Sequence, residues 1–265
     1  GWLQGNYAGF PLFQVYFPFP FLLMVLLSYA IPMQIAFKII SVIGVFSLPL
    51  CSYFAIKLMH YKFPCSIIGA LFTLPFLFME ANSMWGGNIP STLAGEFAFS
   101  IGMSLSVLLL GTLYHGIGKK GGVLLNGVLL FFIGFSHAYA LLFSVLTSAF
   151  FLITAKDFVY KLHYLLKVYT LAFLLLSFWA IPLIANIAYT TNFNISWKMD
   201  SFFEVIPIIL IPFVVVSVMG CIAHIYFCIT KKDSLDVRLG YFWFGIVISI
   251  LFYFSANKMG VVDIR

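Results

Sequence analysis

The chain consists mainly of long apolar stretches separated by short polar or basic turns. An apolar stretch of roughly 20 residues is long enough to cross the hydrocarbon of a bilayer as a helix. The pattern predicts about eight spans, at residues 33–59, 64–79, 91–114, 122–136, 138–155, 168–187, 207–230 and 239–256. We therefore expect an all-α polytopic membrane protein.

The first residues depart from this pattern. Residues 1–20 are rich in aromatic residues, glycine and proline, which predicts an irregular loop on the membrane surface. Residues 21–31 are apolar but too short to span, which predicts an interfacial or re-entrant helix. We accordingly expect two parts: an extracytoplasmic aromatic loop with an interfacial helix, 1–32, and a multi-span transmembrane domain, 33–265.

Three local features are expected inside the transmembrane domain. Pro49 predicts a kink in the first span. His137 separates two apolar stretches and is expected at the tip of a tight helical hairpin. The basic segment 156–167 predicts a short amphipathic linker before the span at 168–187.

Composition supports the membrane class. The chain is 63% hydrophobic and 8% charged, whereas soluble domains carry roughly 25% charged residues. The net charge of +6 comes from residues in short turns, where they act as topology signals and do not indicate a nucleic-acid partner. If the spans alternate, one face collects most basic residues and is predicted to be cytoplasmic; these are Lys57, Lys62, Lys119, Lys120, Lys156, Lys161, Lys167, Lys231, Lys232 and Arg238.

The opposite face, predicted to be extracytoplasmic, receives the polar loop 79–99. This loop ends in a helix start at which Ser91 or Thr92 is expected to cap the free amides. Glu96 then lies about one turn inside the helix, where a carboxylate is costly and is by default a candidate for function. The alternatives are an ion pair with Lys38 or a position high enough to reach water.

Other outer-face residues are also candidates. Glu80, Glu96 and Asp200 carry the oxygen ligands that suit magnesium, calcium or manganese, if they meet in space. His137 could donate to a phosphate or serve as an acid or base, or only cap a helix. On the other side, the helical spacing of Cys221, His224 and Cys228 could present metal ligands, but a packing face is favoured.

Two motifs carry a resemblance to a known family. The opening Asn6–Pro20 segment and the central Trp85–Phe97 segment resemble membrane proteins related to 6-pyruvoyl-tetrahydropterin synthase, and Met259–Arg265 also fits them. These proteins look like GT-C-type glycosyltransferases. The resemblance implies an enzyme of the cell membrane that takes a sugar from a polyprenyl-phosphate carrier at the extracytoplasmic face. No histidine cluster for pterin chemistry is visible on that face.

The resemblance also implies roles for residues. GT-C enzymes place a catalytic acid in the first outer loop, so we expect this sequence to be an internal piece that lacks the first span, that acid and a C-terminal part. Among the residues present, Glu96 is the catalytic candidate, and Glu96 and Glu80 are expected to contact the acceptor or a divalent cation such as magnesium or manganese. The candidates for phosphate, and for sugar stacking or a lipid groove, are His137, Lys38, Arg265, Tyr7, Tyr16 and Trp85.

Three functions stay open on the sequence alone. The first is a glycosyltransferase whose partners are the bilayer and a lipid-linked sugar donor. The second is a transporter or flippase of lipid-linked intermediates. The third is a non-catalytic membrane assembly subunit. For the aromatic residues, anchoring at the membrane surface is an equally good explanation.

Overall fold

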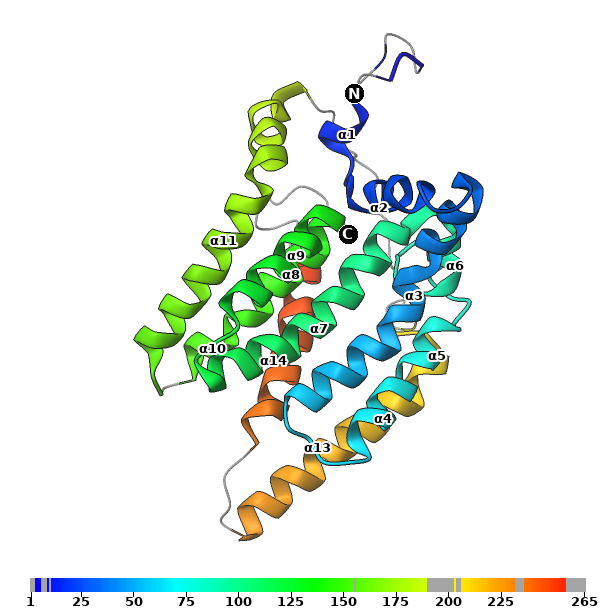
Figure 1. The fold of residues 1–265 in the computed structure, drawn as a ribbon. Coiled ribbons are helices and arrows are strands. Elements are labelled where there is room, and N and C mark those ends of the chain that lie inside the picture. The colour runs from blue at the N-terminus through cyan, green and yellow to red at the C-terminus, as the bar shows by residue number, and fades with distance from the viewer. Residues whose placement is uncertain are drawn as a thin grey trace.

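The computed structural model describes residues 3–5, 9, 11–154, 156–189, 203, 206–231 and 236–255. The elements in this part of the chain are helices (Figure 1). They are α1 (Leu12–Val15), α2 (Phe19–Ser28), α3 (Met33–Leu58), α4 (Cys65–Leu71), α5 (Thr73–Leu77), α6 (Ile89–Ser91), a π-helical turn (Thr92–Glu96), α7 (Phe97–Lys119), α8 (Val123–Ser136), α9 (Ala138–Ser148), α10 (Phe150–Ile153), α11 (Phe158–Ala185), 3₁₀ turns (Ile187–Tyr189 and Ile208–Leu210), α13 (Ile211–Lys231) and α14 (Val237–Ser255).

Several of these helices can cross a membrane. The segments that are long and apolar enough are Met33–Leu58, Ile89–Lys119, Phe158–Ala185 and Ile208–Lys231. Shorter apolar helices occupy the other predicted spans; α8, with 14 residues, extends about 21 Å at 1.5 Å per residue, less than the roughly 30 Å of hydrocarbon. The all-α class is confirmed, and the number of about eight spans stays a prediction.

The central contact of the bundle is between α3 and α7. A Cβ atom added to Gly44 would lie 2.6 Å from the amide nitrogen of Ile101, and one added to Gly111 would lie 2.4 Å from the Cα of Ala55. The Ser104 hydroxyl donates to the carbonyl oxygen of Gly44 at 2.7 Å. In a bilayer, helices associate by such close packing of small residues, because excluding water adds little there.

Hydrogen bonds between buried side chains join the α8–α9 hairpin to its neighbours. The Asn126 amide of α8 donates to the Tyr164 hydroxyl of α11 at 2.7 Å, and that hydroxyl donates to the Gly121 carbonyl oxygen at 2.8 Å. On the other side, the Ser144 hydroxyl of α9 donates to that of Ser106 on α7 at 2.9 Å. The predicted hairpin with its turn at His137 is therefore present, and it lies between α7 and α11.

The opening segment covers one end of the bundle. The short helix α2 lies across the ends of α3, α7 and α8 (Figure 1). The preceding turn is tied to α11, because the Trp179 indole donates to the Phe13 carbonyl oxygen at 2.8 Å and the Gln14 amide donates to that of Pro182 at 3.0 Å. The predicted short helix is present, although it begins at Phe19.

Two predicted elements differ in the structure. The expected span 64–79 is divided into α4 and α5, which are separated by Phe72; Pro75 has no amide hydrogen for the Leu71 carbonyl, so the helix ladder is interrupted here. The separate linker expected at 156–167 was wrong, because the chain from Phe158 onwards already belongs to α11. Tyr164 and neighbouring side chains pack against the core, so the helix also includes Lys161 and Lys167.

Charged residues separate between the two ends of the bundle. The Arg238 guanidinium, at the start of α14, donates to the Met59 carbonyl oxygen at 3.0 Å, and the Lys120 ammonium lies 5.7 Å from the ring centroid of Tyr160. These contacts join the ends of α3, α7, α11 and α14, and we call this the lysine-rich end. The loop 79–88 and His137 lie at the other end (Figure 1).

The α3–α7 contact gives a first prediction. Gly111→Ala should lower the unfolding temperature of the purified chain in detergent, because its Cβ would meet the backbone of Ala55; overpacking of this kind costs about 1–3 kcal/mol. Gly220→Ala on α13 is the matched control, since its Cβ would meet no atom within 4 Å. Equal unfolding temperatures for the two variants would contradict this account of the packing.

Candidate functional site

The loop 79–88, which we call the central loop, is held in place by the buried side-chain amide of Asn88. Asn88 is 0% exposed, and its side-chain nitrogen donates to the carbonyl oxygens of Met79 at 3.2 Å and Ala81 at 2.8 Å. Its side-chain oxygen accepts from the Ser91 amide at 2.9 Å. Asn88 is therefore the helix cap, and the expectation of a cap at Ser91 or Thr92 was wrong.

The hydroxyls of Ser91 and Thr92, which we expected to cap the helix, donate to backbone carbonyl oxygens instead. The Ser91 hydroxyl donates to the Asn82 carbonyl oxygen at 2.9 Å, and the Thr92 hydroxyl donates to that of Asn88 at 2.7 Å. Both side chains are buried, so each needs a partner inside the protein. They fasten the loop 79–88 to the start of the helix.

The glycines of this loop are packed against the protein itself. Gly86 and Gly87 have φ of +88° and +91°, a conformation that favours glycine. A Cβ on Gly86 would lie 2.4 Å from a ring carbon of Phe99, and one on Gly87 would lie 2.9 Å from Phe76. The space beside these two glycines is thus filled by side chains of the protein, while the neighbouring Trp85 remains 41% exposed.

Glu96 lies at a break between two helical segments. The π-helical turn Thr92–Glu96 contains Gly95 at φ +129°, and Glu96 is the residue from which α7 starts. The carboxylate is half-buried and lies at the helix N-terminus, where the macrodipole favours a negative charge. Glu96 is therefore not one turn inside the helix, as expected, but at its beginning, because only glycine readily adopts the backbone angle of Gly95.

The surroundings of Glu96 are open on one side. Apart from its chain neighbours and the adjacent helix backbone, no atom lies within 4 Å of a Cβ built on Gly95, so a ligand can approach the backbone beside the carboxylate. Among the residues that the structure describes, Glu96 forms no ion pair. Lys38, the partner that we considered, is exposed on α3. A structural ion pair therefore does not account for this carboxylate in the described part of the chain.

The opening segment reaches the start of α7 through aromatic contacts. The Phe21 ring centroid lies 5.7 Å from that of Tyr16 and 5.6 Å from that of Phe97. Burial raises the pKa of the Tyr16 phenol, and the negative charge of Glu96 raises it further. The phenol and the carboxylate are thus close enough for the charge of Glu96 to act on Tyr16.

His137 lies between the opening segment and α7. Its ring stacks on Phe17 with a centroid distance of 5.2 Å and meets the edge of Phe99 at 5.0 Å. Its Nδ1 accepts a hydrogen bond from the Tyr139 amide at 3.2 Å, so the proton of the neutral ring is on Nε2. Burial lowers the pKa of His137 to about 4, so the ring is neutral at pH 7.

Not all predicted site residues converge. Tyr16, Glu96 and His137 belong to one connected set through the aromatic contacts above, whereas Glu80 is exposed in the central loop. Within the described ranges, no three His, Cys, Asp or Glu side chains form a group that could hold a metal. The other predicted residues, Tyr7, Asp200 and Arg265, lie outside the described residues.

The histidine and cysteines of α13 form a different arrangement. The Cys228 sulfur lies 3.5 Å from the Nε2 atom of His224, and the Asp236 amide donates to the same nitrogen at 3.3 Å. The Trp243 indole donates to the Cys221 sulfur. These contacts join α13 to the start of α14, as expected of the packing face that the sequence favoured.

Sequence reasoning missed the residues that hold the site together. Asn88 had a recognisable signal, since an asparagine just before a proline in the first turn is typical of a helix start. Phe17 and Phe99, which enclose His137, had none. The chain has 32 phenylalanines, and the sequence does not indicate which of them contacts His137.

Comparison with known proteins identifies one protein family. A family model described as the 6-pyruvoyl-tetrahydropterin synthase related domain, a membrane protein, matches residues 13–254. No curated protein matches the chain, and no solved structure matches it. The matched range contains the central loop, Glu96 and His137. The chain belongs to the 6-pyruvoyl-tetrahydropterin synthase related family of membrane proteins.

Proposed function

We propose that the chain provides the outer-face site of a glycosyltransferase that takes a sugar from a polyprenyl-phosphate carrier. The position of Glu96 carries the proposal: a half-buried carboxylate at an open break before α7, close to the aromatic opening segment. A carboxylate near the membrane is usually either ion-paired or part of a functional site. None of the described residues forms an ion pair with Glu96. The opening and central motifs resemble the 6-pyruvoyl-tetrahydropterin synthase related family, and the likeness of that family to GT-C-type enzymes supports the same reaction class.

The carboxylate serves as a general base in this proposal. It takes the proton from an acceptor hydroxyl, whose oxygen forms a bond to the anomeric carbon of the sugar. The bond between that carbon and the carrier phosphate breaks, and its electron pair leaves with the phosphate. The open backbone at Gly95 gives the acceptor access to the carboxylate.

Neighbouring groups stabilise the departing phosphate. The Nε2–H of neutral His137 donates a hydrogen bond, and the exposed Lys38 supplies a positive charge. The predicted magnesium or manganese ion has no place in this proposal, because the described acidic, histidine and cysteine side chains form no group that could hold it. The aromatic side chains of Tyr16 and Trp85 offer faces for the sugar.

The bilayer supplies the donor in this arrangement. The short helix α2 lies across the ends of α3, α7 and α8 and exposes apolar side chains, including Leu26 at 68%. A lipid-linked donor can therefore remain in the membrane while its phosphate reaches the end that carries Glu96. Apart from Lys38, most lysines of the described chain gather at the opposite end, which favours an extracytoplasmic position for the site.

The role of Glu96 is tested by Glu96→Gln in the full-length protein. We expect sugar transfer from a polyprenyl-phosphate donor to fall by about 100-fold or more, since general-base catalysis contributes roughly 10²–10⁴-fold. The unfolding temperature should stay unchanged, because no described ion pair is broken. Asp157→Asn at the lysine-rich end is the matched control and should retain activity.

The outcomes distinguish the candidate functions. Full transfer activity in Glu96→Gln would overturn the assignment of the base. Absence of transfer in the parent protein, together with movement of the lipid-linked sugar between leaflets in proteoliposomes, would instead identify a transporter or flippase. Absence of both activities would point to an assembly subunit.

The burial of His137 predicts a pH dependence of stability. The folded pKa of about 4 lies below the ordinary value of 6.5, so the folded state resists protonation that the unfolded state accepts. Stability is fully present above pH 6.5 and should decline as the pH falls towards 4. His137→Phe should show a smaller decline in unfolding temperature over this range, and an identical decline would contradict the assignment.

The orientation in the membrane is tested by labelling. Ser83 is exposed in the central loop, so Ser83→Cys on a cysteine-free background should react with an impermeant thiol reagent in intact cells. Lys119→Cys, exposed at the lysine-rich end, should react only after permeabilisation. Protection of Ser83→Cys in intact cells would reverse the proposed topology.

A further inference from the structure

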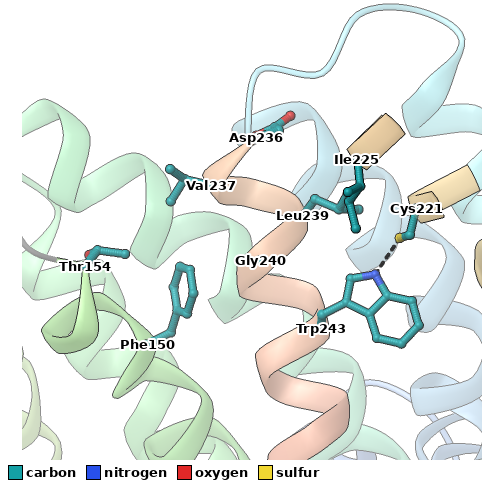
Figure 2. Close-up of a pocket in the computed structure, with 9 residues that line it drawn as sticks. All are labelled: Phe150, Thr154, Cys221, Ile225, Asp236, Val237, Leu239, Gly240 and Trp243. Atoms are coloured by element: carbon teal, nitrogen blue, oxygen red, sulfur yellow. Dashed lines mark hydrogen bonds between the residues drawn. The ribbon is translucent and has the colours of Figure 1, made fainter. Parts of the chain in front are cut away.

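A groove lies at the lysine-rich end, far from Glu96. It has a volume of about 410 Å³ and crosses α14 between α10 and α13 (Figure 2). Phe150 forms one wall, Ile225 forms the other, and Trp243 closes the lower part of the view in Figure 2. Most of the lining is therefore apolar, and the groove suits a hydrocarbon chain.

A glycine of α14 lies at the floor of the groove. Gly240 is exposed and lies between the two walls. A Cβ added there would stand 3.4 Å from the Phe150 ring, an ordinary contact, so alanine would fit. A longer side chain would extend into the groove and take up the space that a ligand would occupy.

Charged groups lie at the edge of the groove. The Lys161 ammonium donates to the hydroxyl of Thr154, a lining residue, at 2.9 Å and to its carbonyl oxygen at 3.3 Å. Lys161 is half-buried and forms no ion pair among the described residues. Asp236 also lines the groove, but its carboxylate is paired with Arg238 at 2.7 Å. Lys161 therefore lies next to the lining residue Thr154 and carries a positive charge that no ion pair neutralises in the described part of the chain.

We propose that this groove binds one phospholipid of the surrounding bilayer, with an acyl chain against Phe150 and Trp243 and an anionic headgroup at Lys161. Charge complementarity selects this occupant, because the apolar lining and the cation at its edge match the two parts of an anionic lipid. The site is separate from Glu96, so it does not depend on the proposed glycosyltransferase activity.

The test is lipid binding to the purified full chain, measured by native mass spectrometry during titration in detergent. The probes are phosphatidylglycerol, which is anionic, and phosphatidylcholine, which is zwitterionic. We expect the first phosphatidylglycerol to bind about fivefold more tightly than phosphatidylcholine, the effect of roughly one basic residue near an anionic headgroup. Lys161→Gln should remove this preference, whereas Lys167→Gln, an exposed lysine of the same helix, should retain it.

A second pair of variants tests the groove itself. Gly240→Leu should abolish the first binding event of both lipids, because the side chain fills the groove. Gly220→Leu, an exposed glycine of α13 whose Cβ would meet no atom within 4 Å, is the matched control and should bind like the parent.

Three results would overturn the proposal. One is equal binding of both lipids by the parent, and another is unchanged phosphatidylglycerol affinity in Lys161→Gln. The third is a lipid-free dimer that Gly240→Leu converts to monomers, which would show that a second copy of the chain covers the groove.

Discussion

The close approach of α3 and α7 is the contact on which the arrangement of the other helices depends. Gly44 and Gly111 remove the side chains that would keep the two backbones apart, and Ser104 adds a hydrogen bond at the same seam. Apolar side chains gain little by leaving lipid for another helix, so packing at van der Waals distance must supply most of the association energy. With α7 held in the centre, its remaining faces pack against α8 and α9.

The position of α7 also explains the geometry of the candidate site. The helix starts after the break at Gly95, so its first turn presents Glu96 to open space and directs the Phe97 and Phe99 rings into the protein. These rings meet the opening segment through Phe21 and through His137. These aromatic contacts fix the start of α7, where Glu96 lies, against the opening segment and His137.

The two ends of the bundle have different chemistry. One end combines a carboxylate, a neutral imidazole and exposed aromatic rings, and the proposed reaction is placed there. The other combines lysines with an apolar groove and the Asp236–Arg238 pair, which suits contact with anionic lipid. Burial of Asn88 and Asn126 among the helices shows that polar side chains elsewhere are used to fix loops and helix contacts.

The sequence by itself determined the class of protein and most helix positions, because uninterrupted apolar stretches leave the backbone no alternative to a helix in lipid. It also predicted the hairpin at His137 and the separation of lysines from Glu80 and Glu96. Only the tertiary structure decided where helices begin and break. Contacts of Tyr164 carry α11 through the lysines, and the torsion at Gly95 moves Glu96 to a helix start. The first feature depends on contacts between distant segments and the second on a single backbone angle, and the local pattern of apolar residues encodes neither.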